Sequence, residues 1–184
     1  MTLRSDVAEL LAGAGIVDVD VDDAVADEHI RSSAYQRVVA VTASSRSRDR
    51  DRAIVATILR DPLEMASKTA VVALVDSIAG KVTSPAEFRQ WSAELLPEID
   101  QLKTEGNREF IRRRIDDWLF HLSIRDGHIP TPAELATVTD WMQRRLAEHS
   151  TSPAVLALLT ESGRTRKTRN IAKDRSRNRK LRTD

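Results

Sequence analysis

Apolar residues recur every three or four positions along most of the chain, which is the spacing of one buried face of an α-helix. The clearest case is the segment 62–79, where a broad apolar stripe predicts the most buried helix: Leu63, Ala66, Ala70, Val71, Leu74, Val75 and Ile78. The same period predicts further helices over 4–12, 23–43, 50–60, 85–103, 107–125 and 132–148. We therefore predict an all-α fold, a single-domain helical bundle of about seven to eight helices.

Four segments begin with a side-chain oxygen followed by proline, a pattern typical of helix starts: Asp61-Pro62, Ser84-Pro85, Thr131-Pro132 and Ser152-Pro153. The side-chain oxygen accepts hydrogen bonds from the free N–H groups of the first turn, and proline at the next position loses no hydrogen bond there. In the first three, a glutamate two residues after the proline completes a capping box. All four segments therefore predict helix N-termini.

Two segments lack the helical pattern. Residues 16–21 alternate apolar and acidic side chains, but no second strand is available to pair with them, so we expect an extended linker. Residues 44–52 (SSRSRDRDR) are low in complexity and predict a loop that leads into a helix. Pro97 lies inside the predicted helix 85–103 and is expected to kink or split it.

The net charge of +1 hides an uneven distribution. Residues 1–30 carry a charge of −7, residues 31–162 are neutral, and residues 163–184 carry +8. We therefore expect a helical body at 1–162 with an acidic N-terminal segment at 1–30, followed by a basic, Arg-rich tail at 163–184. The tail has few large aliphatic residues and its bases fall on opposite sides of a helix, so we expect no face that it could bury in a core.

Arginine-rich segments bind nucleic acid because guanidinium groups match phosphate geometry and each neutralised phosphate releases counterions. The tail sequence RTRKTRNIAKDRSRNRK resembles arginine-rich RNA-binding segments, which fold on their target. An acidic protein surface is the alternative partner, and the choice between DNA and RNA stays open. The predicted nucleic-acid-binding residues are the ten cations of the tail: Arg164, Arg166, Lys167, Arg169, Lys173, Arg175, Arg177, Arg179, Lys180 and Arg182.

Two shorter resemblances concern the predicted helices. Residues 129–136 resemble the opening of the first helix of a helix-turn-helix, but the helical pattern continues where that motif has a glycine-containing turn, so we expect an ordinary bundle helix. Arg114 and His121 are seven residues apart, about two helical turns, which resembles the arginine-to-histidine spacing of HEPN-type ribonucleases. That resemblance implies a dimer cleft acting on the RNA 2′-OH and phosphate, whereas a histidine at the rim of a helical bundle is the structural alternative.

Other chemistry has little support in the sequence. The absence of cysteine excludes disulfides and thiolate metal sites, and there is no Gly-rich phosphate loop, G-x-S-x-G or H-E-x-x-H motif. Asp117 and His121 could share an ion on one helix, but further ligands are not evident, so we expect neither a metal nor a cofactor. The sequence has no apolar run of 18 residues and no secretory pattern, which predicts a cytoplasmic protein without membrane contact.

These observations favour a non-enzymatic helical protein that contacts nucleic acid electrostatically through its basic tail, with little sequence preference, while the bundle makes protein contacts. The first alternative is an assembly or adaptor module, a possible homo-oligomer, in which the acidic head and the basic tail set intermolecular contacts. The second alternative is a HEPN-like ribonuclease that uses Arg114 and His121.

Overall fold

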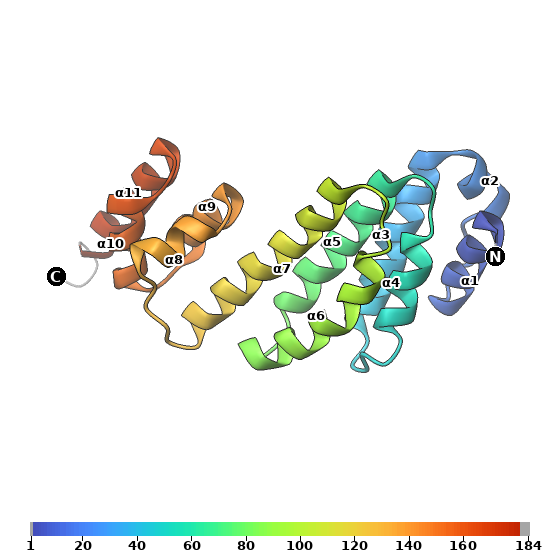
Figure 1. Cartoon of the computed structure of the whole chain (residues 1–184), viewed down its shortest axis with the longest axis horizontal. Helices are drawn as coiled ribbons and strands as arrows, with labels where there is room; N and C mark the ends of the chain where they lie inside the picture. The colour runs from blue at the N-terminus through green and yellow to red at the C-terminus, as the bar shows by residue number, and fades with distance from the viewer. Residues whose placement is uncertain (1, 181–184) are drawn as a thin grey trace. The chain divides into compact units, whose positions relative to one another are not determined.

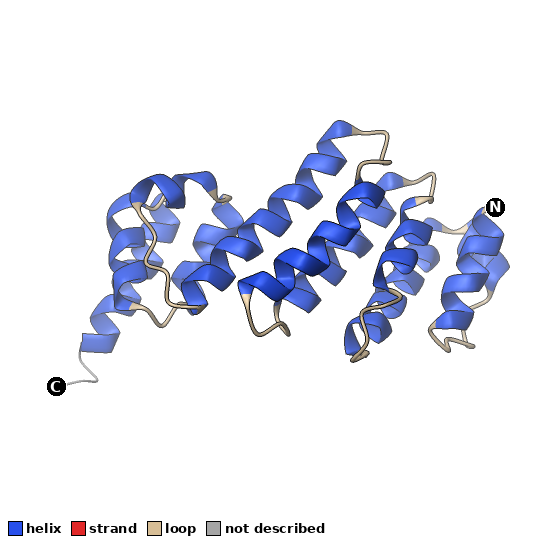
Figure 2. Ribbon diagram, turned by 60° about the horizontal axis from the view of Figure 1, so that its bottom comes forward, coloured by secondary structure: helices blue, strands red, loops and turns tan. Residues whose placement is uncertain are grey.

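The computed structural model describes residues 2–180, with the side chains of residues 2–178, and this part of the chain is helical without any strand (Figures 1 and 2). None of the described helices is long and apolar enough to cross a membrane. The helices are α1 (Leu3–Gly13), α2 (Val21–Ala26), α3 (Glu28–Ser44), α4 (Asp51–Leu59), α5 (Glu64–Ala79), α6 (Pro85–Ile99), α7 (Glu105–Arg125), α8 (Pro132–Thr137), α9 (Asp140–His149), α10 (Pro153–Ser162) and α11 (Arg166–Lys180).

Contacts between residues of the chain group it into two compact units, one ending at Ile115 and the other beginning at Asp116. The division falls inside α7, so the first part of this helix belongs to the first unit and its last part to the second. The composition, in contrast, changes at residue 163. The basic segment is therefore one element of a larger second unit that also contains α8, α9 and α10.

In the first unit, α5 is the central helix, as its apolar stripe predicts. Ala70, Val71, Leu74 and Val75 have no solvent exposure, and α5 packs on α3, α4 and α6. Burying a Val or Leu side chain contributes roughly 1.5–3 kcal/mol. The core of the first unit therefore forms around this helix.

The predicted helix starts are confirmed at three of the four positions. The side chains of Ser84, Thr131 and Ser152 accept hydrogen bonds from the first turns of α6, α8 and α10, with proline next in each case. Asp61 instead lies two residues before the N-cap of α5, which is Leu63. The Asp61 side chain is buried against other polar groups, so it serves the core and not the helix terminus.

Asp61 is the acceptor of a buried hydrogen-bond network. Its Oδ2 accepts from Arg31 Nε at 2.7 Å and from the Tyr35 hydroxyl at 2.8 Å, and its Oδ1 accepts from Leu63 N at 2.7 Å. Arg31 also donates to the carbonyl oxygen of Ala24 at 3.0 Å. Because a buried guanidinium is costly without an anionic partner, this carboxylate holds α2, α3 and the loop before α5 together.

Glu64, the first residue of α5, accepts hydrogen bonds from residues at the start of α7 in the same unit. Its carboxylate accepts from Lys103 N at 2.5 Å and from Asn107 Nδ2 at 2.8 Å. Hydrogen bonds from Thr104 and Asn107 lower the pKa of Glu64 to about 2, because they favour the ionised carboxylate. The Glu64 carboxylate thereby fixes the two residues that lead into α7 and a side chain of its first turn.

The described residues contain eleven helices, more than the seven to eight expected. The predicted helix 23–43 is broken at Asp27, whose side chain caps α3, and the predicted helix 132–148 is broken at Val138 and Thr139, where Thr139 caps α9. The third addition is α11, since most of the basic tail is helical. The predicted helix 85–103 remains continuous past Pro97 but ends at Ile99, within one turn of the proline. Residues 16–20 and 45–50 are loops, as expected.

The second unit buries a side of α11, which corrects the expectation that the basic tail has no face for a core. Thr168 and Ala172 are almost fully buried, and α11 packs on α9 and α10 (Figure 1). Both residues are small and lie one turn apart, so they let the helix approach its neighbours closely. Packing of this kind needs no large aliphatic residues, which is why composition did not reveal it.

Candidate nucleic-acid interface

The exposed side of α11 carries a stripe of three cations and one amide, with the exposed Lys167, Asp174 and Asn178 beside it. Arg166, Asn170, Lys173 and Arg177 are exposed and follow one another at intervals of four, three and four residues, which places them on one side of the helix. Thr168 and Ala172 are buried and lie on the opposite side of the helix. The packing thus converts a sequence with bases all round into a helix with a one-sided basic face, called here the α11 stripe.

Three of the ten predicted phosphate-binding residues hold the fold instead of facing solvent freely. Arg164 Nη1 donates to Asp140 Oδ1 at 2.8 Å, and its Nη2 donates to the carbonyl oxygen of Ala136 at 2.7 Å. Arg169 donates to the carbonyl oxygen of Gly163 at 2.6 Å. Arg175 donates to the last carbonyl groups of α9, at Ala147 and Ser150.

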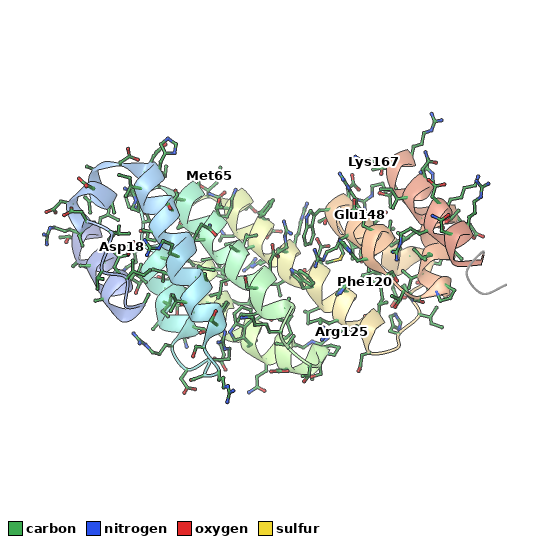
Figure 3. All side chains as sticks on the ribbon, turned by 180° about the vertical axis from the view of Figure 1, so that it is seen from behind. Asp18, Met65, Phe120, Arg125, Glu148 and Lys167 are labelled. Atoms are coloured by element: carbon green, nitrogen blue, oxygen red, sulfur yellow. The ribbon has the colours of Figure 1, made fainter. Side chains whose placement is uncertain are left out.

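These three contacts satisfy carbonyl groups at the C-terminal ends of α8, α9 and α10, where cations are favoured by the helix dipole. Among the other predicted residues, Lys167 is exposed near the start of α11 (Figure 3). The side chains of Arg179 and Lys180, and the whole of Arg182, lie outside the described residues. Of the ten predicted residues, Arg166, Lys167, Lys173 and Arg177 are therefore the described cations that are available to a ligand.

A short, firmly held turn connects α10 to α11. Gly163 is buried, and a Cβ atom at this position would lie 2.5 Å from the carbonyl oxygen of Leu159, so only glycine fits. Arg164 N donates to Gln143 Oε1 at 2.8 Å, and the buried Gln143 amide in turn donates to the carbonyl oxygen of Leu135. Thr165 Oγ1 accepts from Thr168 N at 3.1 Å, which caps the helix. The start of α11 is thus fixed on α8 and α9.

The charge of each unit agrees with the position of this face. Residues 116–184 contain thirteen Lys and Arg against nine Asp and Glu, a net charge of +4, whereas residues 1–115 have a net charge of −3. The first turn of α11 contains no acidic residue, so the positive end of its dipole is not offset there. The second unit therefore combines a cationic surface with a defined helical scaffold.

The hypothesised ribonuclease pair has two different environments along α7. Arg114 lies 3.5 Å from Asp76 and over the ring of Phe110, within the first unit. His121 is half-buried edge-on to Trp118, and its Nδ1 has no hydrogen-bond partner among the described residues. Burial, followed by the charge of a neighbouring arginine, lowers the pKa of this histidine to about 4, so its imidazole is neutral at pH 7.

Asp117, the residue considered as a metal partner of His121, is engaged elsewhere. Its carboxylate accepts hydrogen bonds from the backbone N–H and the hydroxyl of Thr139, at the start of α9. Arg145 lies over the ring of Trp118 at 4.7 Å, and Trp141 packs edge-on against the same indole. Trp118 is buried, whereas Trp141 is 37% exposed, so only part of this cluster belongs to the core.

The expectation of an ordinary continuous helix after residues 129–136 is also corrected, since α8 ends at Thr137 and α9 begins at Asp140. The connecting residues Val138 and Thr139 contain no glycine, and the exposed Arg144 of α9 is paired with Glu148 at 2.8 Å. The α8–α9 pair therefore presents fewer free cations than α11 does.

The described residues thus form a helical protein with a cationic surface on α11. Comparisons with protein-family models, with curated proteins and with solved structures found no match to this chain.

Proposed function

We propose that this protein is a non-enzymatic nucleic-acid-binding protein whose second unit contacts phosphate groups through the α11 stripe. The observation that carries the proposal is the one-sided arrangement of Arg166, Lys173 and Arg177 on a helix whose opposite side is buried. Cations held on a packed helix lose less conformational entropy on binding than cations on an unstructured tail. The affinity is expected to come mainly from phosphate contacts and to fall steeply with added salt.

The alternative, an assembly module driven by acidic and basic ends, is less well supported by the acidic segment. Five of the eight acids in residues 1–30 are engaged locally. Three of them pair with arginines within the chain (Asp6, Asp18 and Asp22), and two cap helices (Asp20 and Asp27). An acidic segment whose charges are occupied in this way has less to offer a second copy. The cations of the α11 stripe have no ion pair among the described residues, which favours an external anion.

Substitution tests this proposal better than truncation, because deleting residues 163–184 would also expose the core that α11 covers. The test variant replaces the three cations of the stripe, Arg166→Ala, Lys173→Ala and Arg177→Ala, in the full chain. Fluorescence anisotropy with a labelled duplex DNA and a structured RNA is measured at several salt concentrations. The triple variant should bind more weakly, and the slope of log affinity against log salt should be less steep by about 2–3.

The matched control removes the same charge from exposed arginines of the first unit: Arg46→Ala, Arg89→Ala and Arg113→Ala. This control should retain most of the affinity if the α11 stripe is the binding surface. Equal losses in both variants would indicate a general charge effect and would reject the stripe as the site. Salt-sensitive self-association in sedimentation velocity without nucleic acid, together with absence of nucleic-acid binding, would favour the assembly module.

A further inference from the structure

We infer that α10, the turn at Gly163–Thr165 and α11 form a helix-turn-helix, and that α11 is its recognition helix, which enters the major groove of duplex DNA. This inference rests on the proposed function and names the ligand of the same surface. It moves the motif to a different helix pair from the one that the sequence resemblance at 129–136 indicated.

The connection has the length and composition of the motif. A helix-turn-helix joins two helices through a turn of three or four residues that often contains glycine. Here α10 ends at Ser162, the turn has three residues and begins with glycine, and α11 begins at Arg166. The two helices pack closely on each other, with Leu159 and Ala172 buried.

The turn is also supported in a way that a loose cationic tail is not. Arg164 and Gln143 fix it to α8 and α9 through hydrogen bonds of 2.7–2.9 Å. A helix that enters a groove must keep its direction relative to the rest of its domain, because ordering it on binding would cost affinity. The hydrogen bonds around the turn supply that fixed direction.

The exposed face has the dimensions and the chemistry of a major-groove reader. From Arg166 to Arg177 the α11 stripe is about 16 Å long, and the major groove of B-DNA is about 12 Å wide and admits one α-helix. Arg and Lys donate to guanine N7 and O6, and Asn pairs in a bidentate manner with adenine. Asn170, between Arg166 and Lys173, is the residue whose contribution cannot be a charge effect.

The shape of the ligand follows from this geometry. The major groove of A-form RNA is deep and narrow and does not admit a helix, so duplex RNA should bind less well than duplex DNA of the same sequence. Binding of single strands relies on aromatic stacking, and α11 contains no aromatic residue. B-form DNA is therefore the nucleic acid that this face fits, and base contacts would add a preference to the phosphate-driven affinity.

The first experiment compares duplex DNA and duplex RNA of one sequence as competitors for the full chain, followed by selection from a randomised DNA duplex. Duplex DNA should compete about tenfold better, and the selection should return an enriched motif. Asn170→Ala should weaken binding to the selected motif several-fold while binding to random DNA is retained. Asn178→Ala, an exposed asparagine on the same helix but off the stripe, is the control and should have no effect.

A second variant tests the turn without changing any charge. Gly163→Ala should reduce binding to the motif because the added Cβ displaces α11, whereas Gly106→Ala, where a Cβ meets no atom within 4 Å, should not. Equal competition by DNA and RNA, with Asn170→Ala unchanged, would overturn the helix-turn-helix and leave the proposed function standing. Failure to bind either nucleic acid would refute both. These outcomes do not depend on Gly163→Ala folding, because Asn170 is a surface residue.

Discussion

Replacing Asp61 with alanine tests the buried ion pair between Arg31 and Asp61 in the first unit. The Asp61 side chain has no solvent exposure and accepts hydrogen bonds from Arg31, Tyr35 and the backbone of Leu63. In the Asp61→Ala variant, Arg31 keeps its hydrogen bonds to the carbonyl oxygens of α2 but loses its only described anionic partner. A buried cation without a counterion is therefore the principal consequence of the change.

The expected cost follows from known cases of broken buried ion pairs. Removing one partner of such a pair destabilises a protein by about 3–5 kcal/mol. Domains are typically stable by roughly 5–15 kcal/mol, so Asp61→Ala should remove a large part of the stability of the first unit. Arg31→Met combined with Asp61→Ala removes the uncompensated charge as well and should be more stable than Asp61→Ala alone.

Urea unfolding, followed by circular dichroism and by tryptophan fluorescence, measures these differences. Asp18→Ala is the control, since Asp18 forms an exposed pair with Arg37 and its loss should leave the urea midpoint nearly unchanged. A cost below about 1 kcal/mol for Asp61→Ala, or a double variant less stable than the single one, would refute the argument that Asp61 compensates a buried guanidinium.

Three further predictions concern pH and packing. The lowered pKa of Glu64 means that its contribution to stability is present above about pH 4.5 and is lost as the pH falls towards 2, so the difference in urea midpoint between wild type and Glu64→Gln should shrink over that window. The lowered pKa of His121 means that the unfolded state takes up a proton first, so the second unit should lose stability between about pH 6.5 and 4, and NMR titration of the imidazole should give a pKa near 4; a value near 6.5 would contradict its burial. Ala172→Leu should destabilise the second unit by about 1–3 kcal/mol through overpacking, whereas Asn178→Leu on the exposed side should not; equal melting temperatures would show that α11 does not pack on α9 and α10.

The sequence predicted helices well where the information is local. Apolar spacing identified α5 as the central helix, and the Ser-Pro and Thr-Pro pairs identified the starts of α6, α8 and α10. Asp61 has the same local pattern but a different role, because Arg31, thirty residues earlier, is buried and needs its carboxylate. That requirement depends on tertiary structure and has no signature near residue 61.

For the candidate site, too, the sequence predicted what is local and missed what depends on tertiary structure. Composition identified the basic segment and all its cations, but it could not show which of them face solvent. The buried positions of α11 are Thr168 and Ala172, one polar residue and one small apolar residue, which do not make an apolar stripe. The structural roles of Arg164 and Arg175 depend on carbonyl groups more than twenty residues away. Gly163 after the Ser152-Pro153 start was the local signal of a turn between two helices.

The two faces of α11 couple ligand binding to folding. The side that carries Thr168 and Ala172 completes the core of the second unit, so the cations of the opposite side exist in their native arrangement only when that core is formed. A ligand that binds this arrangement and not the unfolded chain stabilises the second unit by an amount that grows with ligand concentration, about 2.7 kcal/mol at a hundred times its Kd. Melting temperature is therefore itself a binding assay for this protein, and variants that loosen the core should lose affinity even where no residue of the surface has been changed.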